Sequence, residues 1–194
     1  MDLLFLHSAG PQGGDDGSAP LLRALRHELG DAVRIHAPIM PQPDSPDATA
    51  WDEAVEGHIA KLEQPFVAIG HSLGGSTLLR HFALHTVPQR LLGMICIATP
   101  FWGAPDWEVP DYALPANFAQ RLAALRRLVF YHSSDDQDVD VSHLRRYGAE
   151  LPWAELREVG GRGHVFAGVT VTDIADDART MMAAPSTAAV QRRG

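Results

Sequence analysis

Strand-like and helix-like segments alternate six times along this 194-residue chain, which constrains the fold more than any other feature. Short runs rich in apolar and β-branched residues predict strands at 3–7, 33–38, 66–71, 91–98, 128–133 and 156–161. Longer amphipathic segments predict helices near 18–29, 49–63, 73–86, 116–126, 141–149 and 164–183. Repeated strand–helix units form a mostly parallel sheet covered by helices on both faces, so the sequence predicts a three-layer α/β fold with about six strands.

The pattern fills most of the chain and leaves no room for a second folding unit. Hydrophobic residues make up 45% and charged residues 21%, which is ordinary for a globular protein that buries a core. We assign residues 1–184 to a single domain without a separate cap domain. Residues 185–194 lack periodicity, so we expect a disordered tail. In the first helix, Ser18 is the predicted N-cap and Gly30 the predicted stop.

Charge and compartment signals narrow the classes of partner. The formal net charge of −8 argues against nucleic acid and anionic membrane surfaces as partners. The apolar N-terminal run begins with an acid and is too short for a signal peptide, so we expect a cytoplasmic location. The one cysteine, Cys96, lies in an apolar run and is interpreted as a buried structural thiol.

The segment "GHSLG" matches the G-x-S-x-G pattern with Gly70, Ser72 and Gly74, between a predicted strand and a predicted helix. In such a turn the serine is strained and exposed at the N-terminus of the helix, where free N–H groups favour a developing oxyanion. Side chains at the two glycine positions would collide with neighbouring backbone. The pattern therefore predicts that Ser72 is a nucleophile.

A serine nucleophile needs a base and an acid that orients the base, and both candidates follow later strands. The fifth predicted strand ends in "YHSSDDQDVD", and the sixth ends in "GGRGH", which contains His164. The order serine, acid, histidine is the one expected on this kind of sheet. Four aspartates remain candidates for the acid: Asp135, Asp136, Asp138 and, one strand earlier, Asp106.

Together, "LHSAG", "MPQPDSPDATAW", "GHSLGG", "SSDDQDV" and "GRGH" resemble the α/β-hydrolase superfamily over about residues 1–180. Within it the chain is similar to the small capless serine hydrolases of the retinoblastoma-binding protein nine type. The resemblance implies Ser72 as nucleophile, His164 as base and Asp136 as the favoured acid. It also implies an oxyanion hole made by the backbone N–H of Leu73 and that of Ser8 or Ala9. Neither a cofactor nor a metal is implied.

The segment "TPFWGAPDWEVPDYALPAN" after the fourth strand is long, irregular and rich in aromatic residues. Such a loop is typical of a pocket wall or small lid, although it could equally pack on its own aromatics as an Ω-loop. The candidate pocket residues are His7, His71, Phe101, Trp102 and Trp107. The expected substrate is a small acyl compound, cleaved as a carboxylesterase cleaves its ester.

Other features of the sequence would indicate different functions. The loop "SAGPQGGDDG" does not satisfy G-x-G-x-x-G, and its acids would repel a pyrophosphate. His81 and His85 have a metal-compatible spacing but no obvious third ligand, so they are interpreted as two partly exposed helix histidines. A thioesterase, amidase or acyltransferase could use the same three residues. A binding protein with a vestigial triad is the alternative from another class; it predicts no covalent labelling of Ser72.

Overall fold

The computed structural model describes residues 1–103, 107, 109–166 and 171–183. Six strands form one sheet, in the order β2-β1-β3-β4-β5-β6, and every neighbouring pair is parallel. The strands are β1 (Asp2–Leu6), β2 (Arg34–His36), β3 (Phe66–His71), β4 (Leu91–Ile97), β5 (Leu128–Ser133) and β6 (Glu155–Val159). All six predicted strands are present, and the predicted α/β class is confirmed.

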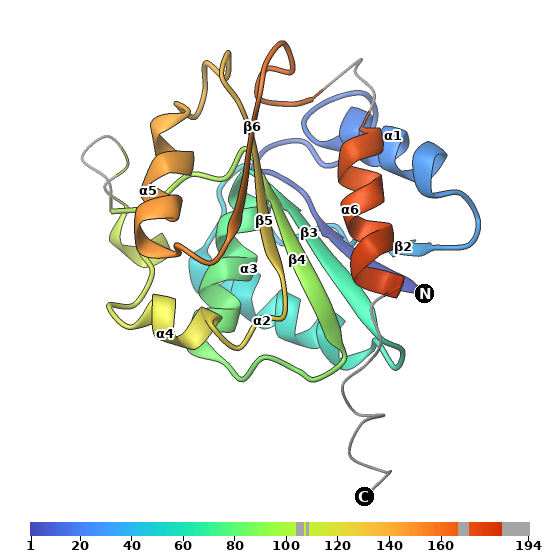
Figure 1. The fold of residues 1–194 in the computed structure, drawn as a ribbon, viewed down its shortest axis with the longest axis horizontal. Coiled ribbons are helices and arrows are strands. Elements are labelled where there is room, and N and C mark those ends of the chain that lie inside the picture. Colours follow the sequence, from blue (N-terminus) through green and yellow to red (C-terminus); the bar gives the residue numbers. More distant parts are fainter. Residues whose placement is uncertain (104–106, 108, 167–170, 184–194) are drawn as a thin grey trace, which may run out of the picture.

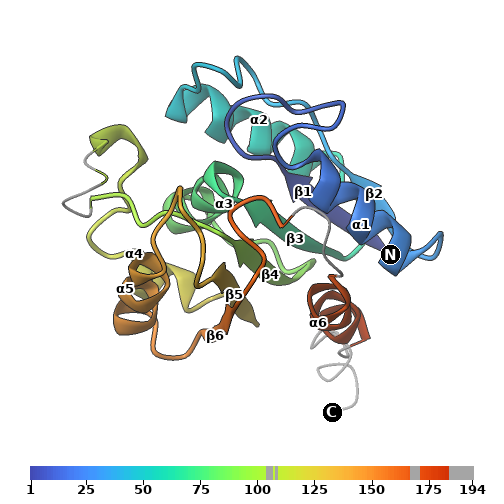
Figure 2. The same ribbon diagram turned by 90° about the horizontal axis from the view of Figure 1, so that it is seen from above.

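Helices cover both faces of the sheet (Figures 1 and 2). They are α1 (Ala19–Leu29), α2 (Ala48–Ala60), α3 (Leu73–Leu84), α4 (Phe118–Leu122), α5 (Ser142–Glu150) and α6 (Thr172–Ala183), with a 3-10 turn η1 (Pro110–Tyr112) before α4. In the described part of the chain, η1 and α4 are the only such elements between β4 and β5. The six-fold alternation thus produces the three layers expected.

Alternate residues of the four central strands β1, β3, β4 and β5 enter two separate cores, as the two-residue period of a strand requires. On β1, Leu4 and Leu6 pack under α2 and α3, whereas Leu3 and Phe5 pack under α1 and α6. Strands buried on both faces explain why their sequences are continuously apolar. Cys96 on β4 is fully buried, as predicted, and burial raises the pKa of its thiol.

The strand order places a topological switch point between β1 and β3. The chain turns outward from β1 to β2 and then returns to add β3, β4, β5 and β6 on the other side. Loops that leave the carboxyl ends of two strands at such a point diverge, and ligands bind in the crevice between them. The loop after β1 and the "GHSLG" turn after β3 both lie there.

Some sequence predictions need correction. The helix predicted for 164–183 begins at Thr172, because Phe166 has φ 53° and the preceding loop contains two left-handed glycines. The helix predicted for 116–126 is limited to α4, and turns occupy the residues before β5. Gly30 ends α1 with φ 65°, as predicted, but the Ser18 hydroxyl caps no N–H of that helix.

The interpretation of His81 and His85 as two partly exposed histidines without a further ligand is wrong in two respects. His81 is only 2% exposed. The carboxylate of Asp52 contacts both imidazoles.

Among the described residues, no helix combines the length and apolar character needed to cross a membrane. The predicted tail at 185–194 lies outside the described residues.

Candidate active site

The turn between β3 and α3 holds Ser72 in a conformation that few residues adopt. Its φ is 51° and its ψ is −119°, and its N–H donates to the carbonyl oxygen of Ile97 at 2.8 Å. A Cβ at Gly70 would lie 2.5 Å from the Cα of Gly75, and one at Gly74 would lie 2.6 Å from the His7 carbonyl oxygen. The glycines are therefore required by close backbone approach, as the sequence pattern predicted.

The structure brings one aspartate of the acidic turn onto the imidazole of His164. The Nδ1 atom of His164 lies 2.9 Å from Oδ2 and 3.1 Å from Oδ1 of Asp136. Asp135 and Asp138 do not occupy this position, and Asp106 lies outside the described residues. The geometry therefore selects Asp136 among the acids of the turn after β5.

The carboxylate of Asp136 has no exposed surface and is held from several sides. It accepts hydrogen bonds from the backbone N–H of Val139 at 2.9 Å and of Asp138 at 3.0 Å, and His132 Nε2 lies 3.3 Å from Oδ2. Burial alone would raise the pKa of Asp136, but the contacts with His132 and His164 and the Val139 N–H hold it well below its usual value. Asp136 is thus a fixed negative charge beside His164.

The neighbouring acid, Asp135, holds the backbone of the loop that carries His164. Its Oδ1 accepts the N–H of Arg162 at 3.2 Å and that of Gly163 at 3.3 Å, and it also accepts the Ser133 hydroxyl. The hydrogen bond from Ser133 and the N–H of Gly163 lower the pKa of Asp135. Two adjacent acids therefore do different things: one contacts the imidazole, and the other positions the loop.

A buried chain of hydrogen bonds connects the turn at Ser72 with the His164 loop and the loop after β1. His71 Nε2 lies 2.8 Å from the carbonyl oxygen of His164, and His71 Nδ1 lies 2.7 Å from Ser18 Oγ. A carbonyl only accepts, so Nε2 carries the proton and Nδ1 accepts from the Ser18 hydroxyl. Burial, with the nearby imidazole of His164, lowers the pKa of His71 to about 3, which keeps this tautomer neutral.

The chain continues from Ser18 to the loop after β1. Ser18 Oγ accepts the backbone N–H of Ser8 at 2.8 Å, and the two hydroxyls lie 2.9 Å apart. Since the Ser18 proton is given to His71, the Ser8 hydroxyl donates to Ser18. The Ser8 N–H is consequently engaged inside the protein, which leaves the N–H of the exposed Ala9 as the candidate for the oxyanion hole beside that of Leu73.

A catalytic triad is expected to have a hydrogen bond between the serine hydroxyl and the histidine, and this conformation lacks it. Within the described part of the chain, Ser72 Oγ and His164 form no hydrogen bond with each other. The residue before Ser72 is nevertheless close to His164, because the rings of His71 and His164 have centroids 5.1 Å apart. Such contacts are often long in unliganded enzymes and shorten when substrate binds.

Two of the predicted pocket residues, His71 and His7, are buried in the interior. His71 is fully buried and both its ring nitrogens are engaged, so it faces the core. His7 is 2% exposed and packs edge-on against Phe5. With Gln12 and Arg26 it lines a cavity of about 320 Å³ beside α1.

The aromatic loop packs on itself, which is the alternative that the sequence left open. Trp102 contacts Trp107 edge-on, with ring centroids 4.9 Å apart, and Tyr112, with centroids 5.1 Å apart. Phe101 packs against Tyr147 of α5. All three predicted aromatics remain partly exposed, so they form a wall of fixed shape beyond the end of β4.

The sequence did not reveal the roles of three residues in this arrangement: Ser18, His132 and Asp135. Ser18 was expected to cap a helix and Asp135 was a candidate for the acid, whereas no role was predicted for His132. His132 instead donates from Nε2 to the Val139 carbonyl oxygen at 2.7 Å and lies against Asp136. Its position four residues before Asp136 was the available signal.

Metal coordination is geometrically conceivable at this site but competes with the arrangement just described. Asp136, Asp138 and His164 carry potential ligand atoms within 4.8 Å of one another. His164 Nδ1 and both Asp136 oxygens are already engaged with each other, and a metal on them would remove that pairing. The hydrogen bonds present fit an oriented imidazole better than a metal ligand.

Comparison with known proteins agrees with this geometry. The profile of a family described as "Serine hydrolase" matches residues 21–171. The chain belongs to this family. A search of curated protein sequences found no match.

Solved structures show the same α/β-hydrolase fold. The ydeN gene product of B. subtilis has a TM-score of 0.77 at 19% identity, over 92% of this chain and 98% of that one. A putative YdeN-like hydrolase of Pectobacterium atrosepticum has a TM-score of 0.68 at 15% identity, covering 93% and 92%. Est1E from Butyrivibrio proteoclasticus has a TM-score of 0.62 at 13% identity, covering 93% and 86%. This serine hydrolase thus shares the fold of these structures over most of its length.

Proposed function

We propose that this serine hydrolase cleaves small carboxylic esters through an acyl-enzyme on Ser72, with His164 as base and Asp136 as the orienting acid. The observation that carries the proposal is the contact of the buried Asp136 carboxylate with His164 Nδ1 beside a strained nucleophile turn. This contact fixes the proton on Nδ1 and leaves Nε2 free to accept a proton.

The chemistry follows from these positions. His164 Nε2 accepts the Ser72 hydroxyl proton as the serine oxygen attacks the substrate carbonyl carbon. The N–H groups of Leu73 and Ala9 stabilise the oxyanion, and collapse of the intermediate expels the alcohol, which takes the proton from His164. Water then attacks the acyl-enzyme after losing a proton to the same nitrogen, and Ser72 is released with its proton restored.

Hydrogen bonds that are present before substrate arrives reduce the reorganisation needed during the reaction. Asp135 holds the backbone before His164, and neutral His71 holds the carbonyl of His164. The imidazole is therefore fixed both through its ring and through its backbone.

Aromatic residues after β4 indicate the class of substrate. The partly exposed aromatics Phe101, Trp102 and Trp107 offer an apolar wall for a small acyl or aryl group. Est1E, a protein of the same fold, has been solved with ferulic acid bound, and this likewise favours a carboxylic acid or ester. Thioesters and amides would use the same three residues, and the leaving group decides among them.

A fluorophosphonate probe tests the nucleophile directly. We expect covalent labelling of the native protein at one site, loss of labelling in Ser72→Ala, and unchanged labelling in Ser45→Ala, which removes an exposed serine of the loop between β2 and α2. Native protein that fails to label would contradict the proposal and favour a binding protein with a vestigial triad.

The substrate class needs a separate measurement. p-Nitrophenyl esters from acetate to decanoate, compared with acyl thioesters and anilides, should give the highest kcat/KM with short esters. If thioesters or anilides were cleaved faster than every ester, the triad assignment would stand but the carboxylesterase assignment would be wrong.

A further inference from the structure

Four ionisable side chains meet between α2 and α3, at the end of α3 remote from Ser72. Asp52 and Glu56 lie one turn apart on α2, whereas His81 lies in the last turn of α3 and His85 is the C-cap of that helix. Residues spaced by four positions share a helix face. Two such pairs on packed helices therefore present two carboxylates and two imidazoles to one another.

The contacts within this group are short. His81 Nδ1 lies 2.9 Å from Asp52 Oδ1, and His85 Nε2 lies 2.8 Å from Asp52 Oδ2. His81 Nε2 lies 3.3 Å from Glu56 Oε2. Potential ligand atoms of Asp52, His81 and His85 all fall within 4.8 Å of one another.

His81 faces a carboxylate from both of its ring nitrogens: Nδ1 faces Asp52 and Nε2 faces Glu56. A histidine that binds a metal through one nitrogen usually donates its other N–H to a carboxylate, which holds the ring in position. The contacts of His81 therefore fit a ligand that binds a metal through Nδ1 and is oriented by Glu56.

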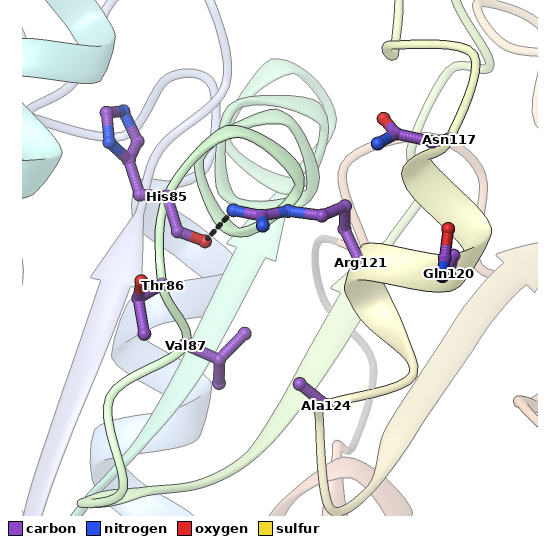
Figure 3. A pocket seen from close by; sticks show the side chains of 7 residues that line it. All are labelled: His85, Thr86, Val87, Asn117, Gln120, Arg121 and Ala124. Carbon is purple, nitrogen blue, oxygen red and sulfur yellow. Dashed lines mark hydrogen bonds between the residues drawn. The ribbon is translucent and has the colours of Figure 1, made fainter.

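The ligands are held in place before any ion arrives. In Figure 3 the imidazole of His85 points away from the other labelled side chains, while its carbonyl faces the guanidinium of Arg121. Arg121 Nη2 donates to the carbonyl oxygens of Leu84 and His85 at 3.2 Å, and Arg121 Nε donates to that of Ala83. This clamp fixes the backbone from which the His85 side chain extends.

Burial leaves one side of the group open to an entering ion. The side chains of His81 and Asp52 are 2% and 15% exposed, whereas those of His85 and Glu56 are 44% and 64% exposed. An ion could enter from solvent and be held by the buried pair. The Glu56 carboxylate, which faces Nε2 of His81, would orient that ring.

We propose that Asp52, His81 and His85 bind one Zn²⁺ ion, with a water molecule in the fourth position. Mixed imidazole and carboxylate ligands suit Zn²⁺ rather than Mg²⁺ or Ca²⁺. With ligands about 2.0–2.1 Å from the ion, a tetrahedron places ligand atoms roughly 3.3 Å apart. His81 Nδ1 and His85 Nε2 lie 2.9 and 2.8 Å from the Asp52 oxygens, so small side-chain movements would bring the three ligands to this spacing.

The ion would act as a clip between two helices and not as a catalytic centre. His81 lies nine positions after Ser72, which is about 13 Å along a helix at 1.5 Å per residue. The site shares no residue with Ser72, Asp136 or His164. Its occupancy should therefore change the stability of α2 and α3 without changing the chemistry at Ser72.

Isothermal titration of untagged, EDTA-treated and dialysed protein with Zn²⁺ tests the site. We expect one equivalent to bind, and His85→Ala and Asp52→Asn to weaken binding by at least the roughly 100-fold found when a metal site loses a supporting group. Two controls should bind as wild type does. His27→Ala removes an exposed histidine of α1. His164→Ala removes a ligand from the other candidate metal-binding group, which consists of Asp136, Asp138 and His164.

Two spectroscopic readouts separate a built site from surface binding. Co²⁺ in place of Zn²⁺ should give the intense visible absorption of a tetrahedral ion, and it should be lost in His85→Ala. Zn²⁺ at 100 times its Kd should raise the Tm of wild type by about 5–10 °C. His85 is half exposed, so its replacement should leave the fold and Ser72 labelling intact.

Three outcomes would overturn the proposal. Binding that is equally tight in wild type and His85→Ala would place the ion elsewhere. Binding lost only in His164→Ala would assign it to the active site. A wild type that binds no Zn²⁺ at micromolar concentrations would leave the four side chains as an ion-pair cluster. None of these outcomes would affect the fluorophosphonate test of Ser72.

Discussion

Two regions of this serine hydrolase use the same three groups, an aspartate between two histidines, in different settings. Asp136 lies between His132 and His164 at the carboxyl edge of the sheet, and its carboxylate is fully buried. Asp52 lies between His81 and His85 on packed helices, and its carboxylate is 15% exposed. The chemical composition is alike, but the scaffolds differ.

The scaffold decides what each carboxylate can do. The histidines of Asp136 come from β5 and from the loop after β6, and backbone N–H groups occupy its remaining lone pairs. The histidines of Asp52 come from one helix, and one of them is open to solvent. The first carboxylate is therefore a fixed charge beside His164, whereas the second can exchange its partners.

The largest expected effect separates the two aspartates by activity. Asp136→Asn should lower the rate of Ser72 labelling and of ester hydrolysis by roughly 10³–10⁴-fold, because the amide can no longer stabilise the His164 imidazolium or hold its tautomer. Asp52→Asn should change the same rates by less than about twofold. A variant Asp136→Asn that kept a tenth of wild-type activity would show that another acid orients His164.

A smaller effect is expected from the second histidine of the buried cluster. His132→Asn removes the N–H that holds the Val139 carbonyl and lies against Asp136. We expect kcat to fall roughly 10- to 100-fold with KM nearly unchanged, because the variant misplaces the acid without altering substrate contacts. Equal changes in KM and Tm with an unaltered kcat would assign His132 a purely structural role.

Local patterns in the sequence predicted the fold and the strained turn at Ser72, because strand periodicity and the glycine-flanked turn are local properties. The choice among the acids was harder, because a shift of one residue in a turn changes which carboxylate faces inward. The N–H of Asp136 donates to the Ser133 carbonyl oxygen, and this turn points its side chain at His164. The family resemblance favoured Asp136, but only the geometry of the turn distinguishes its position from that of Asp135.

Tertiary partners explain what local patterns missed. Ser18 has the local signature of a helix cap, yet its hydroxyl bonds to His71, 53 positions away in the chain. His81 has the spacing of a metal ligand, but its partner Asp52 lies on another helix, 29 positions earlier. Side chains that can bond locally or over long range are settled by packing, which a single sequence does not display.

Another buried histidine, His71, contacts a hydroxyl and a carbonyl instead of a carboxylate. It should therefore lower the stability of the folded protein at acidic pH. In the unfolded chain it takes up a proton below about pH 6.5, whereas in the folded protein its pKa is about 3. The unfolded state therefore binds one more proton between these values. The free energy of unfolding should fall as pH falls, by about 1.4 kcal/mol per unit at full slope.

Urea unfolding of wild type and His71→Gln between pH 7 and pH 4 measures this contribution as a difference. The variant should be less stable at pH 7, because one hydrogen bond is lost, and the gap should narrow as the pH falls. The other histidines contribute equally to both proteins and cancel. Parallel stability curves would show that His71 is not held neutral in the folded protein.

The smallest expected effect returns to the solvent-exposed side of the Asp52 cluster. Without metal, His85→Gln should cost less than about 1 kcal/mol, since exposed ion pairs contribute little, and the Tm should fall by no more than about 2–4 °C. Thermal unfolding in EDTA measures this value. A larger metal-free loss would mean that the cluster stabilises the fold by its own hydrogen bonds, as the Asp136 cluster does. A small metal-free loss together with a large loss in Zn²⁺ would instead show that the open aspartate needs an ion to join the two helices.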